Sequence, residues 1–258
     1  MYSLKQKTVF ITGASSGIGE ACAKAFASTG ARLILAARRI ERLQNLADTL
    51  KTEIPNIDVH LIHLDVTQRK EVDNTITNLP QAWRQIDVLI NNAGLAAGRD
   101  HLQDANIDDW EAMINTNVKG LLYMTKAIIG DMLARQSGHI INIGSIAGHF
   151  TYPGASVYCA TKAAVRSITQ ALRQDICGSK VRVSEVDPGA VETEFSLVRY
   201  KGDKDAAKQV YQDMTPLSAD DVADAVLYCA TRPLHVNVAE LVLYPTDQAS
   251  VTMIHRKT

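Results

Sequence analysis

Tyr158 and Lys162 are the two residues of this chain whose types and spacing point most directly to chemistry. They are four residues apart, so on a helix both side chains lie on one face. A tyrosine with its ordinary pKa of about 10 is a poor base at neutral pH. A neighbouring ammonium and a bound cationic ring both favour the phenolate. We therefore expect a lowered pKa for Tyr158 and a proton-transfer role for this residue.

Ser145 and Asn117 extend this candidate site. Ser145 follows an apolar run that predicts a strand, and its hydroxyl can donate to a substrate oxygen on which charge develops. Asn117 lies in a predicted helix and could hold a water next to Lys162 for a proton relay. Taken singly, a Tyr–Lys pair on a helix surface, a serine cap and an asparagine cap are common features. Only their joint order along the chain favours catalysis.

A glycine-rich turn occupies positions 12–19, directly after one apolar run and directly before a helical pattern. Glycines at this spacing allow a tight turn and bring the backbone close to a pyrophosphate. The following helix offers free N–H groups and a partial positive charge to the phosphates. Many strand–helix turns carry glycine, but the strand before and the helix after predict a dinucleotide site. The expected contacts are Gly13, Ser15, Ser16, Gly17, Ile18 and Gly19.

The end of the second predicted strand indicates which dinucleotide would bind. An NAD enzyme is expected to carry a carboxylate near Ala37 that accepts from the ribose 2′-hydroxyl, and this chain has none there. Arg38 and Arg39 instead present planar, permanently charged donors that suit a 2′-phosphate. The alternative is a solvated arginine pair at a helix start. With the acid missing at the same place, the pattern favours NADP(H).

Two further segments follow predicted strands and are candidates for cofactor contacts. Asp65 could accept from the adenine amino group while Val66 packs on the ring, or Asp65 could cap the helix that begins near position 68. The small residues after the fourth strand allow backbone to approach the cofactor, or they form a simple turn. The candidates there are Asn92, Ala93 and Gly94.

The remaining pattern alternates short apolar runs with longer helical stretches, which predicts a doubly wound parallel sheet in a single α/β domain spanning 1–258. The expected strands are 8–12, 32–36, 58–64, 88–91, 139–143, 180–186 and 240–243. The expected helices are 17–29, 40–51, 68–78, 107–135, 157–176 and 219–231. The polar and aromatic segment 190–217 breaks this rhythm, and a connection of that length predicts a lid over the substrate.

Composition narrows the class of protein. The 258 residues carry a net charge of −1 and no long basic run, which argues against nucleic-acid binding. Four scattered cysteines favour reduced thiols, and the histidines show no metal-ligand spacing. No apolar stretch reaches the roughly 18 residues that span a bilayer. We expect a metal-free cytoplasmic protein with no membrane partner and a small-molecule substrate.

These motifs together resemble the short-chain dehydrogenase/reductase family over essentially the whole chain. The resemblance implies a Rossmann-like sheet of seven parallel strands with helices on both faces, and a homotetramer that buries the helices at 107–135 and 157–176. It implies a catalytic tetrad of Asn117, Ser145, Tyr158 and Lys162, the last two also contacting the cofactor. The residues that carry it are the turn at 12–19, Asn91 to Gly94, the tetrad and Pro188–Gly189. Further cofactor contacts are implied at Pro188, Gly189, Val191 and Thr193.

A narrower resemblance concerns the substrate. The runs 86–96, 138–145 and 193–203 are similar to the NADP-dependent serine and 3-hydroxy acid dehydrogenases. This implies oxidation of serine, allo-threonine and 3-hydroxypropionate, or reduction of the semialdehydes, with the oxygen held by Ser145 and Tyr158. Arg199 is a candidate cation for the carboxylate, or a surface arginine on a mobile loop. The run Arg99-Asp100-His101 departs from this branch, in which small or apolar residues are common there.

Two other functions compete with this one. A broad carbonyl or diketone reductase could use the same scaffold and the same proton-transfer group. A non-catalytic NADP-sensing protein would require the loss of catalytic residues, whereas Ser145, Tyr158 and Lys162 are all present.

Overall fold

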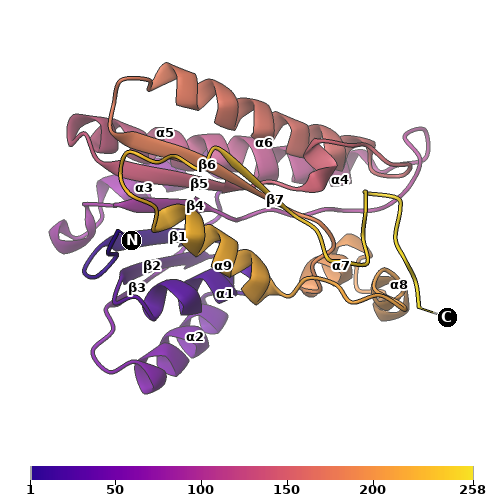
Figure 1. Ribbon diagram of the computed structural model, residues 1–258, viewed down its shortest axis with the longest axis horizontal. Helices are drawn as coiled ribbons and strands as arrows, with labels where there is room; N and C mark the ends of the chain where they lie inside the picture. The colour runs from indigo at the N-terminus through magenta and orange to yellow at the C-terminus, as the bar shows by residue number, and fades with distance from the viewer. Residues whose placement is uncertain (1, 258) are drawn as a thin grey trace.

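One parallel β-sheet runs through the molecule, between two layers of helices (Figure 1). The protein was analysed as a computed structural model, which describes residues 2–257. Within them, seven strands pair in the order β3-β2-β1-β4-β5-β6-β7, every neighbouring pair parallel. The predicted Rossmann-like, doubly wound α/β fold is confirmed. The strands are β1 Thr8–Thr12, β2 Arg32–Ala37, β3 Val59–His63, β4 Val88–Asn91, β5 Gly138–Ile143, β6 Val181–Pro188 and β7 Glu240–Leu243.

The helices cover both faces of this sheet. Helices α1, α2 and α9 pack on one face, and α3, α5 and α6 pack on the other. Among the described helices, none combines the length and the apolar composition that a bilayer-spanning segment requires. The helices are α1 Gly17–Ala27, α2 Ile40–Glu53, α3 Arg69–Thr77, α4 Ile107–Ile114, α5 Leu121–Ala134, α6 Ser156–Asp175, α7 Glu194–Arg199, α8 Lys204–Gln209 and α9 Ala219–Ala230.

The apolar runs form central strands because both of their faces are buried. Successive side chains of a strand point to opposite faces of the sheet. In β1, Val9 and Ile11 therefore enter the core beneath α1, α2 and α9, whereas Phe10 enters the core beneath α3, α5 and α6. All three side chains are fully buried. A strand that feeds two cores has to be apolar at every position, and this is why the run shows no alternation.

Three departures from the sequence prediction bear on the site, besides shifts of one or two residues at the ends of other elements. The expected helix 107–135 is divided into α4 and α5 by a π-helical turn at Asn115–Gly120. Such wider turns are frequent at functional sites. Strand β6 continues to Pro188, two residues beyond the predicted end. The segment 190–217 contains the short helices α7 and α8, where the sequence indicated only an irregular connection.

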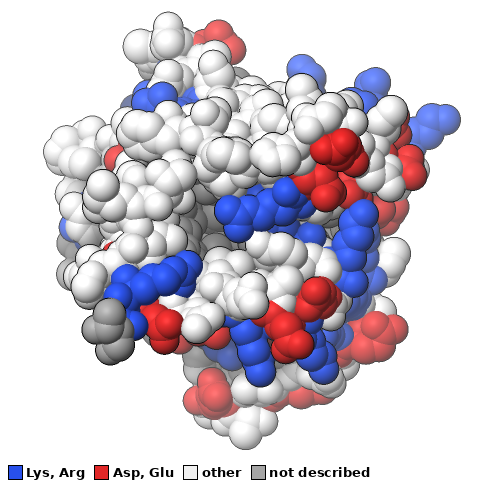
Figure 2. Space-filling model, turned by 90° about the vertical axis from the view of Figure 1, so that its right-hand side faces the viewer, with Lys and Arg blue, Asp and Glu red and all other residues white. Residues whose placement is uncertain are grey.

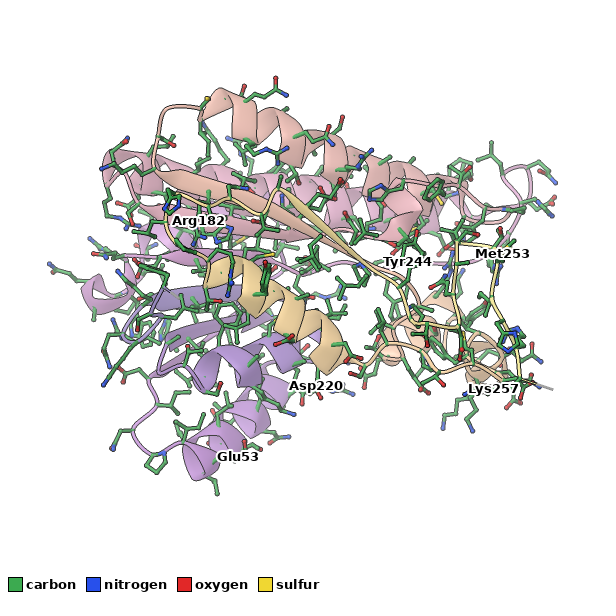
Figure 3. All side chains as sticks on the ribbon, viewed as in Figure 1. Glu53, Arg182, Asp220, Tyr244, Met253 and Lys257 are labelled. Carbon is green, nitrogen blue, oxygen red and sulfur yellow. The ribbon has the colours of Figure 1, made fainter. Side chains whose placement is uncertain are left out.

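The two ends of the sheet differ in their polar chemistry. Near the start of β6, the buried guanidinium of Arg182 donates to the carbonyl oxygens of Cys229 and Ala230 at the end of α9. A cation at this place matches the negative end of the helix dipole. Figure 3 shows Arg182 at the opposite end of the molecule from Tyr244 and Met253, which lie near α7 and α8. The carboxyl ends of the strands reach the latter end, where a parallel sheet places its ligand sites.

Candidate active site

The hydroxyl of Thr12 fastens the carboxyl ends of β1 and β4 to each other. Its Oγ1 accepts from the backbone N–H groups of Asn92 and Ala93, both at 3.0 Å, and donates to the carbonyl of Ile90 at 3.2 Å. In return, Nδ2 of Asn92 donates to the backbone oxygens of Thr12 and Gly13, at 2.9 and 3.2 Å. The predicted asparagine thus holds the glycine-rich turn in place.

Two glycines of the turn are required by close packing. Gly13 has φ +65°, and a Cβ there would lie 2.9 Å from Cα of Ala93. A Cβ on Gly19 would collide with the carbonyl oxygen of Gly13 and with Nδ2 of Asn92. The carbonyl oxygen of Gly13 belongs to the backbone and cannot move aside without shifting the turn. Gly19 therefore lets α1 approach β1 closely, and the turn remains open toward the carboxyl end of the sheet.

The start of α1 is left free for an anion. Ser16 precedes this helix, and its side chain forms no capping hydrogen bond with the described residues. Instead, Oγ of Ser16 accepts from Nη2 of Arg39 at 2.7 Å, and Oγ of Ser15 accepts from its Nε at 3.3 Å. The first N–H groups of a helix have no partners within the helix. They fit a diphosphate, as the glycine-rich turn predicted.

An ion-pair cluster joins the segment 190–217 to this turn. The carboxylate of Glu194 lies 3.0 Å from Nη1 of Arg39 and 2.7 Å from Nη1 of Arg42. Sequence reasoning missed Glu194 and Arg42, because more than 150 positions separate the partners. Arg38, the other predicted phosphate ligand, is exposed and lies at the edge of the same cavity.

A cavity of about 900 Å³ opens at the carboxyl end of the sheet. Figure 2 shows a hollow on this face of the molecule with lysine and arginine side chains around it. Most of the predicted site residues line the cavity, whereas Gly19 and Asn117 do not and act from behind its wall. Those that line it are Gly13, Ser15, Ser16, Gly17, Ile18, Arg38, Arg39, Asp65, Val66, Asn92, Ala93, Gly94, Ser145, Tyr158, Lys162, Pro188, Gly189, Val191, Thr193 and Arg199.

Asp65 stabilises the turn that precedes α3. Its Oδ1 accepts from the backbone N–H and the hydroxyl of Thr67, at 2.9 and 2.8 Å. The residue before the helix is Gln68, so Asp65 is not the helix cap that the sequence left open as an alternative. The carboxylate lines the cavity as well, which keeps the adenine contact as a prediction.

Helix α6 buries Tyr158 and Lys162 together, as their spacing predicted. The Tyr158 ring packs against Phe195 of α7 with centroids 5.7 Å apart, and Cζ of Arg199 lies 5.3 Å from the ring centroid. Nζ of Lys162 donates to the carbonyl of Ile143 at 2.8 Å. The tyrosine therefore contacts a cation from the 190–217 segment, while the lysine is anchored on β5.

The surroundings of Tyr158 raise its pKa. Burial is the main cause, because it disfavours the charged phenolate, and Tyr152 adds to the effect. A hydrogen bond with Ser145 and the positive charge of Arg199 act in the opposite direction and lower the pKa. The groups of this chain therefore act against the expected lowering, which also relied on a bound cationic ring, and the lowered pKa of the loaded site stays a prediction. Desolvation by the overlying segment 190–217 could not be read from the Tyr–Lys spacing.

Burial also acts on Lys162 and lowers its pKa to about 8. The negative charges of Glu185 and Asp187 oppose this effect and raise the pKa. Keeping Lys162 charged in this buried position therefore carries a large desolvation cost. Its charge depends on the acidic residues of β6, which the sequence analysis did not single out.

Asn117 connects the cavity wall to α6. Its Oδ1 accepts from the N–H of Leu95 at 2.8 Å, and its Nδ2 donates to the carbonyl of Leu95 at 2.8 Å and to Oγ1 of Thr161 at 3.0 Å. Both amide N–H groups are therefore in use. The side chain can only accept from a relay water, and the relay remains a prediction.

Ser145 is placed to donate. It begins a short 3₁₀ turn, and its Oγ accepts from the N–H of Ala147 at 3.1 Å. The bond occupies a lone pair and leaves the hydroxyl proton available to Tyr158 or to a substrate oxygen in the cavity, which Ser145 lines.

The guanidinium of Arg199 has one occupied edge and one free edge. Its Nη1 donates to the hydroxyl of Tyr152 at 2.8 Å. Its Nε and Nη2 are buried and have no hydrogen-bond partner among residues 2–257. These two atoms form the edge that binds a carboxylate with two parallel hydrogen bonds. No motif or spacing pointed to Tyr152, which lies 47 positions from Arg199 in the chain.

Comparison with known proteins agrees with this geometry. Residues 7–203 match the family model for short chain dehydrogenase. An NADP-dependent 3-hydroxy acid dehydrogenase of Schizosaccharomyces pombe is 44% identical over 258 residues, covering 100% of this chain and 99% of that protein. Sulfoacetaldehyde reductase 2 of Chromohalobacter salexigens is 48% identical over 242 residues, covering 93% and 95%. The closed form of a serine dehydrogenase complexed with NADP+ superposes with a TM-score of 0.91, at 44% identity, covering 97% and 100%.

This chain belongs to the short chain dehydrogenase family. The resemblance inferred from the motifs at 12–19, 91–94 and 158–162 is confirmed, and so is the class of enzyme, an oxidoreductase that acts on an alcohol or its carbonyl product.

The packing around Gly19 predicts the effect of one methyl group on cofactor binding. We expect Gly19→Ala to weaken NADPH binding at least 10-fold, because the added Cβ displaces the carbonyl of Gly13 and the turn around it. Fluorescence titration with NADPH measures this. The matched control is Gly130→Ala in α5, where a Cβ would meet nothing within 4 Å and alanine favours the helix. Equal affinities for the two variants would contradict the role of the turn.

Proposed function

We propose that the protein transfers hydride between NADP(H) and a small 3-hydroxy acid or its semialdehyde. The observation that carries the substrate class is the unpartnered edge of Arg199, a residue that lines the same cavity as Tyr158 and Ser145. The names of the relatives point the same way, since a 3-hydroxy acid and sulfoacetaldehyde both combine an acid group with an alcohol or carbonyl.

The cofactor site fits NADP(H). The uncapped start of α1 and the open glycine turn would hold the diphosphate. Arg38 and Arg39 would hold the 2′-phosphate, since β2 ends at Ala37 with no carboxylate to receive a 2′-hydroxyl. Asp65 and Val66 would contact the adenine. Residues at the other end of the cavity would contact the nicotinamide half, namely Asn92, Ala93, Gly94, Tyr158, Lys162, Pro188, Gly189, Val191 and Thr193.

Tyr158 is the proton-transfer residue of this proposal. When bound, NADP⁺ would supply the hydride acceptor, and its positive ring would favour the phenolate. Ser145 donates a hydrogen bond to the substrate oxygen and orients it toward Tyr158. In oxidation Tyr158 accepts the hydroxyl proton, and in reduction it returns a proton to the carbonyl oxygen. Because burial raises its pKa, Tyr158 rests as a phenol and is ready to act as the acid in reduction.

Arg199 gives the site its preference for an acid. A guanidinium with two buried, unpartnered N–H groups, as counted over the described residues, carries a desolvation cost that a carboxylate removes. The same side chain lies over the Tyr158 ring. It therefore places the acid group next to the proton-transfer residue and stabilises the phenolate. A neutral diketone would leave the free edge of Arg199 unpaired, which disfavours the alternative of a broad carbonyl or diketone reductase.

We also propose that segment 190–217 closes over the substrate as a lid and that the protein is a cytoplasmic homotetramer. The lid is supported by the contacts of Phe195 and Arg199 with Tyr158. The tetramer is supported by the apolar side chains of Ile107, Ile114 and Leu122, which are exposed on α4 and α5. Localisation remains a prediction from the sequence.

Removing the phenol oxygen tests the mechanism. We expect Tyr158→Phe to lower kcat by at least 1,000-fold, roughly the loss of general acid–base catalysis, while NADPH affinity changes less than 3-fold. Steady-state kinetics at 340 nm and NADPH titration measure the two quantities. Turnover close to that of the unmodified enzyme would contradict the assignment, because a structural tyrosine can be replaced by phenylalanine without loss of chemistry.

A substrate panel tests the acid preference. With NADP⁺, we expect turnover of L-serine, L-allo-threonine and 3-hydroxypropionate, and little with NAD⁺. Comparing 3-hydroxypropionate with its methyl ester isolates the carboxylate, because both use the same Tyr158. We expect Arg199→Gln to lower the acid-to-ester ratio of kcat/KM about 30-fold, since a hydrogen bond to a charged group contributes about 2 kcal/mol.

The matched control is Arg99→Gln. Arg99 also lines the cavity but is exposed, with its Nη1 donating to Tyr200 at 3.2 Å. We expect the ratio to change less than 3-fold, because solvent screens an exposed charge. If all three acids are inert while diketones are reduced, the substrate class is wrong and the diketone reductase is the better description.

A further inference from the structure

Two acidic residues lie buried beneath the catalytic helix, although the mechanism above does not use them. Glu185 and Asp187 are 1% and 0% exposed, and both project from β6 to the same face of the sheet. Oε1 of Glu185 and Oδ1 of Asp187 have no hydrogen-bond donor within residues 2–257. Two ionised carboxylates in such a place would carry a large desolvation cost together with their mutual repulsion.

The two unpartnered oxygens lie side by side. Both occupy the space where a Cβ on Gly144 would stand, so this glycine makes room for the pair. The carboxyl groups are close enough to share a hydrogen bond. One proton between them would supply the missing donor and leave a single negative charge, as expected for carboxyls that cannot both ionise at close range.

The neighbours of Asp187 decide which partner carries the proton. Nε2 of His149 lies 3.2 Å from Oδ2 of Asp187 and 3.6 Å from Oε1 of Glu240. Burial raises the pKa of Asp187, but this contact opposes that effect and favours the ionised form, which leaves the proton on Glu185. Burial raises the pKa of Glu185 in the same sense. His149 and the partly exposed Glu240 also connect the buried pair to the surface.

The cation that faces this pair from the catalytic helix is Lys162. Its Nζ is bonded to the carbonyl of Ile143, which directly precedes Gly144. The pair and the ammonium are therefore separated by one peptide of β5, and the negative charge of the pair favours the ammonium form. The charged and titratable groups around the pair come from α6, β7 and the turn after β5, and are Lys162, Arg166, Glu240 and His149.

We propose that Glu185 and Asp187 form a proton-sharing pair whose single negative charge keeps Lys162 protonated, with His149 holding the ionised partner. They are positioning residues, because they act on the substrate only through Lys162. This inference rests on the role proposed for Lys162 as the cation beside Tyr158. On this proposal, the two acidic residues of β6 set the upper pH limit of alcohol oxidation.

The sign of the effect follows from the charge on Lys162. The pKa of this lysine is about 8, so the ammonium is lost as the pH rises through that value. Where bound NADP⁺ has already brought Tyr158 to the phenolate, oxidation declines with this loss. Removing the negative charge makes the ammonium easier to lose. We expect Asp187→Asn to move the alkaline limb of the kcat profile down by at least about one pH unit, as for a nearby charge at an effective dielectric constant of about 20.

Glu185→Gln removes the protonated member of the pair and keeps the negative charge of Asp187. At neutral pH the amide resembles the protonated acid, so we expect kcat to change less than 3-fold. The alkaline limb should move down by less than in Asp187→Asn. The matched control is Glu240→Gln, which removes an acid next to His149 but away from Gly144, and we expect the limb to stay within about 0.3 units of that of the unmodified enzyme.

Infrared spectroscopy tests the shared proton without turnover. We expect the carbonyl stretching band of a protonated carboxyl group at pH 7, its loss in Glu185→Gln and its retention in Glu240→Gln. Absence of the band at pH 7 overturns the proposal, even if Asp187→Asn does not fold. If Tyr158→Phe is inactive but Asp187→Asn leaves the alkaline limb unmoved, the proposal fails and the proposed function stands. If Tyr158→Phe is fully active, the proposed function fails.

Discussion

The fastening of β1 to β4 through Thr12 is the constraint on which the rest of the structure depends. Parallel strands end at one edge of their sheet, but their connections leave that edge in opposite directions at the switch point. The hydroxyl of Thr12 accepts from two backbone N–H groups of the connection that follows β4. In return, the side chain of Asn92 donates two hydrogen bonds to backbone oxygens of the connection that follows β1. The starts of the two connections are thereby fixed relative to each other. The glycine turn lines one side of the cavity, and the loop after β5 that carries Ser145 lies farther along the same edge.

Burial of Tyr158 and Lys162 places both side chains in the site and also disfavours their charged forms. Tyr158 and Lys162 share one face of α6, which packs against β6. Desolvation shifts the pKa of each residue in the direction that favours its neutral form. The protein opposes this with charges from other elements. Arg199 comes from the segment 190–217 above the tyrosine, and the acidic residues of β6 lie beneath the lysine. The charge state of the site is therefore set by elements that sequence order separates widely.

Local patterns predicted the sheet because each central strand feeds two cores and has to be apolar throughout, as in β1. The Tyr158–Lys162 pair and the glycine turn were also predictable, since helix periodicity and backbone approach are local properties. Other features depend on packing between distant segments. Glu194 forms an ion pair with Arg39, and Tyr152 accepts a hydrogen bond from Arg199. Gly144 leaves space for the carboxyl groups of Glu185 and Asp187. None of these contacts corresponds to a spacing that can be recognised in the sequence. The π-helical turn at Asn115–Gly120 also escaped prediction, because its residues continue an ordinary helical pattern.

A crystal structure of the protein with NADP⁺ and 3-hydroxypropionate tests the central claim most directly. The account predicts that Nε and Nη2 of Arg199 each donate to one carboxylate oxygen of the substrate. It places the substrate hydroxyl within hydrogen-bond distance of both Tyr158 and Ser145. A carboxylate that points to solvent or toward Arg99, with Arg199 bonded only to Tyr152, would contradict it.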